Sequence, residues 1–461
     1  MFGLFKPRPP LEVHEQAWVE RHLTLLAGLL GPQRMGLSGG GLPQQLLPSQ
    51  EITGLRSEAD AERLFDRILD RLAPNAPALT LAWFDGDALL ETDPAAIPVP
   101  RTALADPMSL AAGLVRQACR RTFHSELSAA ARQYDLAGTA LGLGLPLANA
   151  DAPAPSTGET GDRDLTSREI GYALALLWHV RQEGEGSTDD PPWVDELRGD
   201  AAGAVTGGLK YLRKVGDARF NAASLRGESD PTEAEIRTEL RHRRPARRLA
   251  ATWDAAQLSR RESVSPGVES ATLHTLLETL HDREPAVRAG ACGAVAALWP
   301  DEDSARDDWD RCLLGLTGAA DDPIAAVRAA ALSGLGMNPD LPSTGAGREE
   351  LNRVTLEGLA SRTPAVRQAA SALACALPPA ESGGAESPFA PATLKALVGA
   401  LVRVDGPEIA EHVATLRTLH PDPAALAEER VDDGELLARA LDALGVAELE
   451  TPEAEEAAVA T

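Results

Sequence analysis

The second half of the chain repeats one pattern of hydrophobic and polar positions at a nearly constant interval. A short Ala-Val-Arg or related segment marks each repeat, and its arginine occurs at Arg248, Arg288, Arg328 and Arg367. The steps between these arginines are 40, 40 and 39 residues. A fixed period of this size predicts stacked helical hairpins, because one hairpin cannot bury its apolar face alone.

Two amphipathic helices are predicted in each interval, one on either side of the arginine segment. Around Arg288 the first helix carries an apolar stripe of Leu273, Leu276, Leu277 and Leu280, and the second a stripe of Val287, Ala291, Ala294, Val295 and Leu298. Pro285 is expected to open the second helix, where its missing N–H is not needed. A fifth hairpin is expected over 394–419, with Ala410 in place of the marker arginine.

These repeats resemble the HEAT family over roughly 231–420, with about 40 residues per helical hairpin. The resemblance implies a C-terminal α-solenoid of about five hairpins that binds protein along its curved face. We expect the marker arginines to bond acidic or backbone groups between adjacent repeats, near Asp282 and Asp322, and not to touch a partner.

The first half predicts a small α+β domain in a mainly α chain. Helices are predicted at 11–30, 57–72, 107–123, 133–148, 167–181 and 193–214, and short strands at 79–84 and 97–100. The expected organisation is a domain over 1–226, the solenoid over 227–445, and an acidic disordered tail over 446–461.

Composition narrows the classes of partner. The formal net charge of -25 argues against general affinity for nucleic acid or an anionic membrane. An arginine cluster over 237–248 is interleaved with glutamates and lacks aromatic neighbours, so a structural role is favoured there. The four cysteines form no CxxC pair, and no segment is apolar enough to span a bilayer. These features favour a cytoplasmic protein.

A second resemblance covers 97–214. Motifs follow one another there as in a zinc-metallopeptidase-like domain of uncharacterised bacterial proteins: Asp106-Pro107-Met108-Ser109-Leu110, then Gly142-Leu143-Gly144 to Asn149, then Gly171-Tyr172-Ala173-Leu174-Ala175-Leu176 with Arg181, then Pro191-Pro192-Trp193, and last Gly208-Leu209-Lys210-Tyr211-Leu212. The resemblance rests on the order and spacing of these motifs taken together.

The HExxH motif of such domains is absent. In that motif two histidines on one helix face bind zinc and the glutamate acts as general base. Arg116 and Arg120 stand at the histidine positions and Gln117 at the glutamate position, while Asp135 keeps the acidic third-ligand position. Arginine has no free lone pair and repels a cation, so the resemblance implies a peptidase-like domain without catalytic equipment.

A replacement for the metal follows from the spacing. Arg116 and Arg120 are four residues apart and share a helix face, so both can approach Asp135. We expect a guanidinium–carboxylate bridge in the space where such domains hold zinc. Separation of the Asp135 carboxylate by more than about 6 Å from both guanidinium groups would exclude this bridge.

The functional hypothesis is therefore a non-catalytic protein–protein interaction scaffold, not an enzyme, without metal or cofactor. Its partner is expected to be a protein, with neither nucleic acid nor membrane bound. The alternative is a hydrolase with a relocated metal site in the N-terminal domain. A weaker third reading is a repeat-containing lyase or nucleic-acid glycosylase, which the scarcity of Trp and Tyr in 260–440 disfavours.

Overall fold

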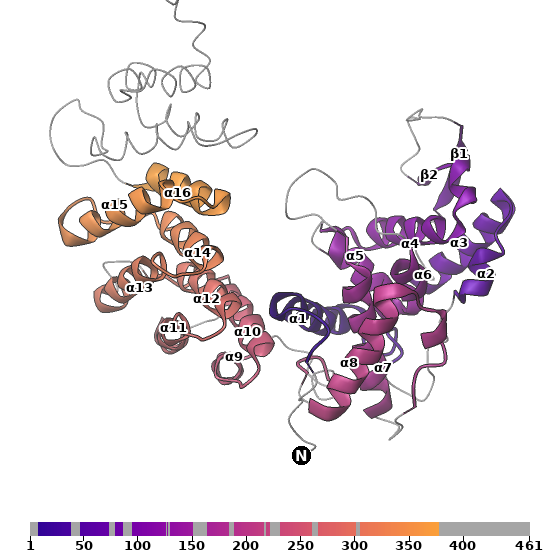
Figure 1. Ribbon diagram of the computed structural model, residues 1–461, viewed down its shortest axis with the longest axis horizontal. Coiled ribbons are helices and arrows are strands. Elements are labelled where there is room, and N and C mark those ends of the chain that lie inside the picture. The colour runs from indigo at the N-terminus through magenta and orange to yellow at the C-terminus, as the bar shows by residue number, and fades with distance from the viewer. Residues whose placement is uncertain are drawn as a thin grey trace, which may run out of the picture. The chain divides into compact units, whose positions relative to one another are not determined.

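The chain forms two compact units, Met1–Asp230 and Pro231–Thr461. The computed structural model describes residues 8–37, 47–72, 79–85, 95–125, 127, 130–150, 164–183, 189–215, 218–221, 231–260, 266–300 and 305–377. The described residues are mainly helical, with two short strands (Figure 1). Over these residues no helix combines the length and the apolarity needed to cross a lipid bilayer.

The first unit is built mostly of helices. They are α1 (Val13–Leu30), α2 (Ser49–Thr53), α3 (Glu58–Leu72), α4 (Pro107–Phe123), α5 (Ala131–Gly138), α6 (Gly144–Asn149), α7 (Ser167–Glu183) and α8 (Gly199–Val215). The predicted helix over 57–72 is confirmed as α3, whose apolar stripe is buried. Ser57 caps this helix, because its hydroxyl accepts the N–H of Asp60 at 3.2 Å.

The two predicted strands pair in parallel as β1 (Thr80–Phe84) and β2 (Ala96–Pro100), with Leu81 opposite Ile97. Two of the five residues of β2 are prolines, Pro98 and Pro100, which have no N–H to donate. A strand with such gaps is tolerated at a sheet edge, as the sequence predicted. In the described sheet β2 has β1 as its neighbour on one side only.

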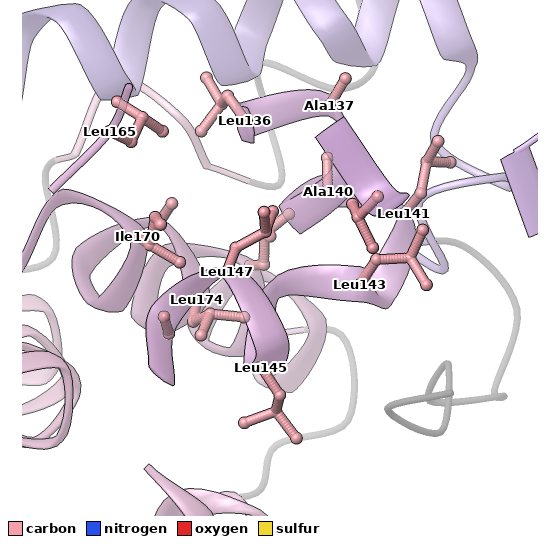
Figure 2. Packing of buried hydrophobic residues seen from close by; sticks show 14 of the residues in the cluster. Leu136, Ala137, Ala140, Leu141, Leu143, Leu145, Leu147, Leu165, Ile170 and Leu174 are labelled. Carbon is pink, nitrogen blue, oxygen red and sulfur yellow. The ribbon is translucent and has the colours of Figure 1, made fainter. Parts of the chain in front are cut away.

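The prediction of one continuous helix over 133–148 is wrong. The chain instead forms α5, a π-type turn at Thr139–Leu143, and α6. Gly142 interrupts the helix with a φ of 89°, a left-handed value that favours glycine. Around this break, one buried cluster contains Leu141, Leu143, Leu145 and Leu147 together with residues of α7 (Figure 2).

Helices α7 and α8 pack very closely in the first unit. A Cβ atom at Gly171 would lie 2.6 Å from the carbonyl oxygen of Ala201, so this contact requires glycine. The next residue, Tyr172, is fully buried and donates its hydroxyl to Oε1 of Glu20 at 2.8 Å. The Gly171-Tyr172 motif therefore holds α8 and α1 against α7.

The second unit is a series of helix pairs. They are α9 (Glu233–Leu240) with α10 (Pro245–Leu258), α11 (Pro266–Thr279) with α12 (Pro285–Ala297), α13 (Arg306–Ala319) with α14 (Ala325–Gly336), and α15 (Gly345–Leu359) with α16 (Pro364–Ala376). The first helices of successive pairs contact one another, and the second helices do the same (α10 with α12, α12 with α14, α14 with α16). The expected fifth hairpin over 394–419, like the tail over 446–461, lies outside the described residues.

The predicted stripes form the contacts in these rows. Val287, Ala291, Ala294, Val295 and Leu298 are all buried, as are Leu273, Leu276 and Leu280, while Leu277 is half-buried. Pro285 is the first residue of α12, as predicted, because its fixed φ suits a helix start and its missing N–H has no helical partner.

Candidate functional site

The first candidate site lies on α4. A capping residue followed by a proline marks the start of this helix in the sequence. Asp106 caps the helix by accepting the N–H of Ser109 at 3.2 Å, and Pro107 occupies the first helical turn. The helix buries its apolar face in the unit core and leaves Gln117 and Arg120 exposed, with Arg116 half-buried between core and solvent.

Asp135 of α5 is fully buried and lies against Arg116. Oδ1 of Asp135 accepts the Nε–H of Arg116 at 2.8 Å, and Oδ2 lies 3.5 Å from Nη2. The backbone N–H of Leu165 also donates to Oδ2 at 3.0 Å. The expected bridge is therefore present, but it is made by Arg116 alone. The expectation that Arg120 also faces Asp135 is wrong, because its side chain is exposed.

Two opposing effects act on the Asp135 carboxyl. Burial disfavours its charged form, and the Arg116 guanidinium and the Leu165 N–H favour it. A second carboxylate, that of Asp164, lies 3.5 Å from Nε of Arg116 and forms an ion pair with the same guanidinium. Burial prevails and raises the pKa of Asp135 to about 6, so at neutral pH the pair is ionised.

This raised pKa predicts a pH dependence of stability. Folded Asp135 keeps its proton up to about pH 6, whereas the unfolded carboxyl releases it near the ordinary value of 3.8. The free energy of unfolding should therefore fall as pH rises from about 4 to 6, by up to about 1.4 kcal/mol per pH unit. Urea unfolding at a series of pH values measures this slope. Asp135→Asn should remove it, and equal slopes in both proteins would contradict the assignment.

An open groove adjoins this ion pair. Its volume is about 350 Å³, and it is lined by residues of β2 and α4 that include Ile97, Val99, Leu110 and Leu114, with Arg116 and Gln117 also in the lining. Gly113 lies in the lining too, and a Cβ atom there would meet no atom within 4 Å. The groove combines an apolar floor, an edge strand and one cation, which are features of surfaces that bind extended peptides.

Metal ligands are not gathered in this region. Among the described residues no group of three or more His, Cys, Asp or Glu side chains is placed to hold a metal ion. The nearest histidine in sequence, His124, is exposed at the end of α4, with Nδ1 3.4 Å from the Arg121 carbonyl oxygen.

The second set of predicted residues, the marker arginines, forms a ladder in the second unit. Nε and Nη2 of Arg248 donate to the Asp282 carboxylate at 2.6 and 2.8 Å. Arg288 holds Asp322 in the same way at 2.7 and 2.9 Å. The prediction of bonds between adjacent repeats near Asp282 and Asp322 is confirmed for these two steps.

The Asp322 carboxyl differs from Asp135 in its ionisation. Burial alone would raise its pKa, but the hydrogen bonds from Arg288 and from the Ile324 N–H, with the charges of Arg288 and Arg328, leave it below the ordinary value. The pKa of Asp282 is lowered in the same way, since Arg248 and the Glu284 N–H outweigh its burial. Both carboxylates therefore stay ionised well below neutral pH.

Sequence reasoning missed a second role of these aspartates. Asp282 accepts the N–H of Glu284, and Asp322 that of Ile324, each at 2.8 Å, so each also stabilises the turn that leads into the next helix. The signal was present, because each aspartate stands six residues before a marker arginine. It also missed Arg353 of α15, which binds Glu350 and Glu357 of its own helix and Asp321 of the preceding repeat.

Comparison with protein families and with curated proteins finds no family model and no protein that matches this sequence.

Proposed function

We propose that this protein is a non-catalytic scaffold for protein–protein interaction. In this proposal a degenerate metallopeptidase-like unit is followed by a HEAT-like α-solenoid, and both take part in binding a protein partner. The observation that carries it is the 2.8 Å contact between Arg116 and buried Asp135. A cation of the chain itself then takes the place where the resemblance puts zinc.

The electrostatics of this contact support the non-catalytic reading. A divalent ion at Asp135 would lie against a guanidinium that stays protonated, and Gln117 has no basic group to accept a proton from water. The arginine and glutamine together thus oppose both metal binding and general-base catalysis at this position. The remaining use of the site is recognition by the neighbouring groove.

Support for the solenoid comes from the second unit. First helices contact first helices and second helices contact second helices in successive pairs, and Arg248 and Arg288 link three of these pairs in series. An array of hairpins of this kind presents a long surface suited to protein binding. The HEAT-like assignment rests on this packing together with the 39- to 40-residue period.

Metal analysis tests the non-catalytic part of the proposal. The full chain, purified without chelator and dialysed against zinc, should contain far less than one equivalent of zinc or other transition metal. Stoichiometric metal, retained through gel filtration, would overturn the proposal and favour the alternative of a hydrolase with a relocated metal site. A broad peptide-library cleavage assay with the same sample gives a second readout.

A groove-filling substitution tests the binding part. Gly113→Phe should place a ring in the groove beside β2 without a clash, because a Cβ atom there meets open space. A partner recovered by affinity capture with the wild-type chain, then purified, should bind this variant at least tenfold more weakly. Isothermal titration calorimetry measures the affinity.

The matched control is Gly203→Phe. Gly203 is likewise in a helix, is exposed, and has no atom within 4 Å of an added Cβ, but it lies on α8 outside the groove lining. This variant should bind the partner as the wild type does. Equal affinity of the Gly113→Phe variant and the wild type would show that the groove is not the binding surface.

A further inference from the structure

One position recurs in all four described repeats of the second unit, six residues before the marker arginine. It is His242, Asp282, Asp322 and Ser361. In each repeat its side chain accepts the backbone N–H two residues later, at 2.8 to 3.2 Å. In each repeat its carbonyl oxygen also accepts Nη1–H of the marker arginine, at 2.8 to 3.0 Å. The position therefore has a constant structural role.

The arginine of the preceding repeat gives the same position a further role. Arg248 and Arg288 direct the remaining edge of the guanidinium, Nε and Nη2, to the carboxylate of Asp282 and of Asp322. The partner is 34 residues further along the chain in both cases. Nη1 of each of these arginines thus bonds a carbonyl oxygen in its own repeat, while Nε and Nη2 bond the aspartate of the next repeat.

The third step of this ladder would run from Arg328 to the next repeat. There the position equivalent to Asp282 and Asp322 holds no aspartate. Arg328 makes the constant bonds with its Nη1, to the carbonyl oxygens of Asp322 and Pro323 at 2.8 and 3.1 Å. The position that would receive its other edge is Ser361, whose hydroxyl accepts the Thr363 N–H at 3.2 Å. Serine keeps the bond to the backbone N–H two residues later but has no carboxylate. Among the described residues, Nε and Nη2 of Arg328 have no hydrogen-bond partner.

A pocket opens where the carboxylate is missing. Its volume is about 710 Å³, and its lining includes Arg328, Ser361, Arg362 and Arg353. Arg362 is exposed and adds a second positive charge at the rim. Arg328 and Ser361, the two positions of the third step, thus line one solvent-open pocket.

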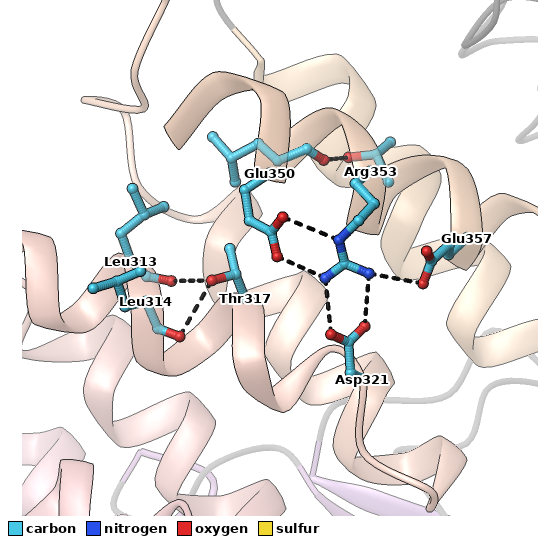
Figure 3. Close-up of polar contacts among 9 residues, drawn as sticks. Leu313, Leu314, Thr317, Asp321, Glu350, Arg353 and Glu357 are labelled. Carbon is cyan, nitrogen blue, oxygen red and sulfur yellow. Dashed lines mark hydrogen bonds and ion pairs between the residues drawn. The ribbon is translucent and has the colours of Figure 1, made fainter. Parts of the chain in front are cut away.

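Apart from Arg362 at the rim, the other charged side chains of the lining are already paired. Arg353 donates to Asp321, Glu350 and Glu357, at distances from 2.6 to 3.0 Å (Figure 3). Together with the bond from Nε to Glu350 at 3.0 Å, these bonds engage all three nitrogens of its guanidinium, so Arg353 has no nitrogen without a partner. Asp322 is held by Arg288. Over the residues that the structure describes, the donors of the lining that remain without a partner are Nε and Nη2 of Arg328 and the solvent-exposed guanidinium of Arg362.

We propose that this pocket binds a carboxylate, supplied by an aspartate or glutamate side chain of a protein partner, which completes the third step of the ladder. A fork of two parallel N–H donors matches a carboxylate, and the two upstream steps display that geometry with aspartate. Within the described part of the chain the ladder has one unfilled fork, which suits one acidic side chain. A free dicarboxylate would leave its second carboxylate to Arg362 at the rim, where a solvent-exposed ion pair contributes little. This inference concerns the second unit and does not depend on the groove beside Arg116.

The test is to supply the missing carboxylate within the chain. Ser361→Asp should fill the Arg328 fork, because Asp282 and Asp322 do so at the same position of the repeat. Ser361→Asn is the matched control, since asparagine has nearly the same shape as aspartate and can accept the Thr363 N–H but has no charge. The probes are a fluorescent pentapeptide with a central aspartate, the same peptide with asparagine, and free succinate as competitor, all with the full-length chain.

Anisotropy titration should show saturable binding of the aspartate peptide to the wild type and to Ser361→Asn. Affinity for Ser361→Asp should be at least tenfold weaker, and the thermal midpoint of this variant alone should rise by about 2–4 °C. Absence of saturable binding up to roughly 1 mM peptide would overturn the proposal. Equal binding by the asparagine peptide or by Ser361→Asp would do the same, as would competition by succinate as strong as by the unlabelled peptide.

Discussion

Replacing Asp135 with alanine should lower the free energy of unfolding by about 3–5 kcal/mol at pH 8, the usual cost of removing one partner of a buried ion pair. Its carboxylate is fully buried and accepts from Arg116 and from the Leu165 N–H. Its loss leaves a buried backbone donor unpaired and a half-buried guanidinium without its nearest counter-charge. Urea unfolding followed by circular dichroism gives the measurement.

Two variants separate charge from packing. Asp135→Asn keeps most of the volume and a carbonyl oxygen for the Leu165 N–H, so its loss of stability should be smaller than that of Asp135→Ala. Arg120→Ala removes the exposed arginine one turn further along α4 and should change stability by no more than about 0.5 kcal/mol. If Arg120→Ala cost as much as Asp135→Ala, the pairing of Asp135 with Arg116 would not be the stabilising contact.

The helices that could be predicted from the sequence are those with a clear boundary and one apolar face. Ser57 and the stripe after it located α3, and Pro285 located the start of α12. The segment over 133–148 carried no such contrast, because every residue from Tyr134 onward is buried. Hydrophobic periodicity then has no polar face to mark a break, and the positive φ of Gly142 could not be distinguished from an ordinary helical glycine.

The side-chain contacts of the candidate site could likewise be predicted from the sequence only in part. The four-residue spacing predicted that Arg116 and Arg120 share one side of a helix. It could not predict which of the two lies beside α5. In the structure Asp135 lies beside Arg116, so one of the two arginines faces solvent. The ladder was easier to predict, because a repeat period fixes which positions are equivalent. Ser361 could be read as the exception once the two roles of Asp282 and Asp322 were known.

Replacing Arg288 with alanine should lower the free energy of unfolding of the second unit by about 3–5 kcal/mol. Both partners are largely buried, with 13% of the Arg288 side chain and 10% of the Asp322 side chain exposed. The variant leaves the Asp322 carboxylate without its bidentate partner and removes a donor from the Asp282 carbonyl oxygen. Urea unfolding with a tryptophan fluorescence signal measures the loss.

Arg328→Ala is the control that the chain itself provides. Arg328 occupies the equivalent position and bonds the equivalent carbonyl oxygen, but it holds no carboxylate among the described residues. Its replacement removes the equivalent backbone bond, and a second one to the Pro323 carbonyl oxygen, but no bond to a carboxylate, so it should cost about 2 kcal/mol less than Arg288→Ala, within the range for hydrogen bonds to charged groups. Equal losses in the two variants would mean that the bonds between repeats add nothing, and that the arginines act only within their own turns.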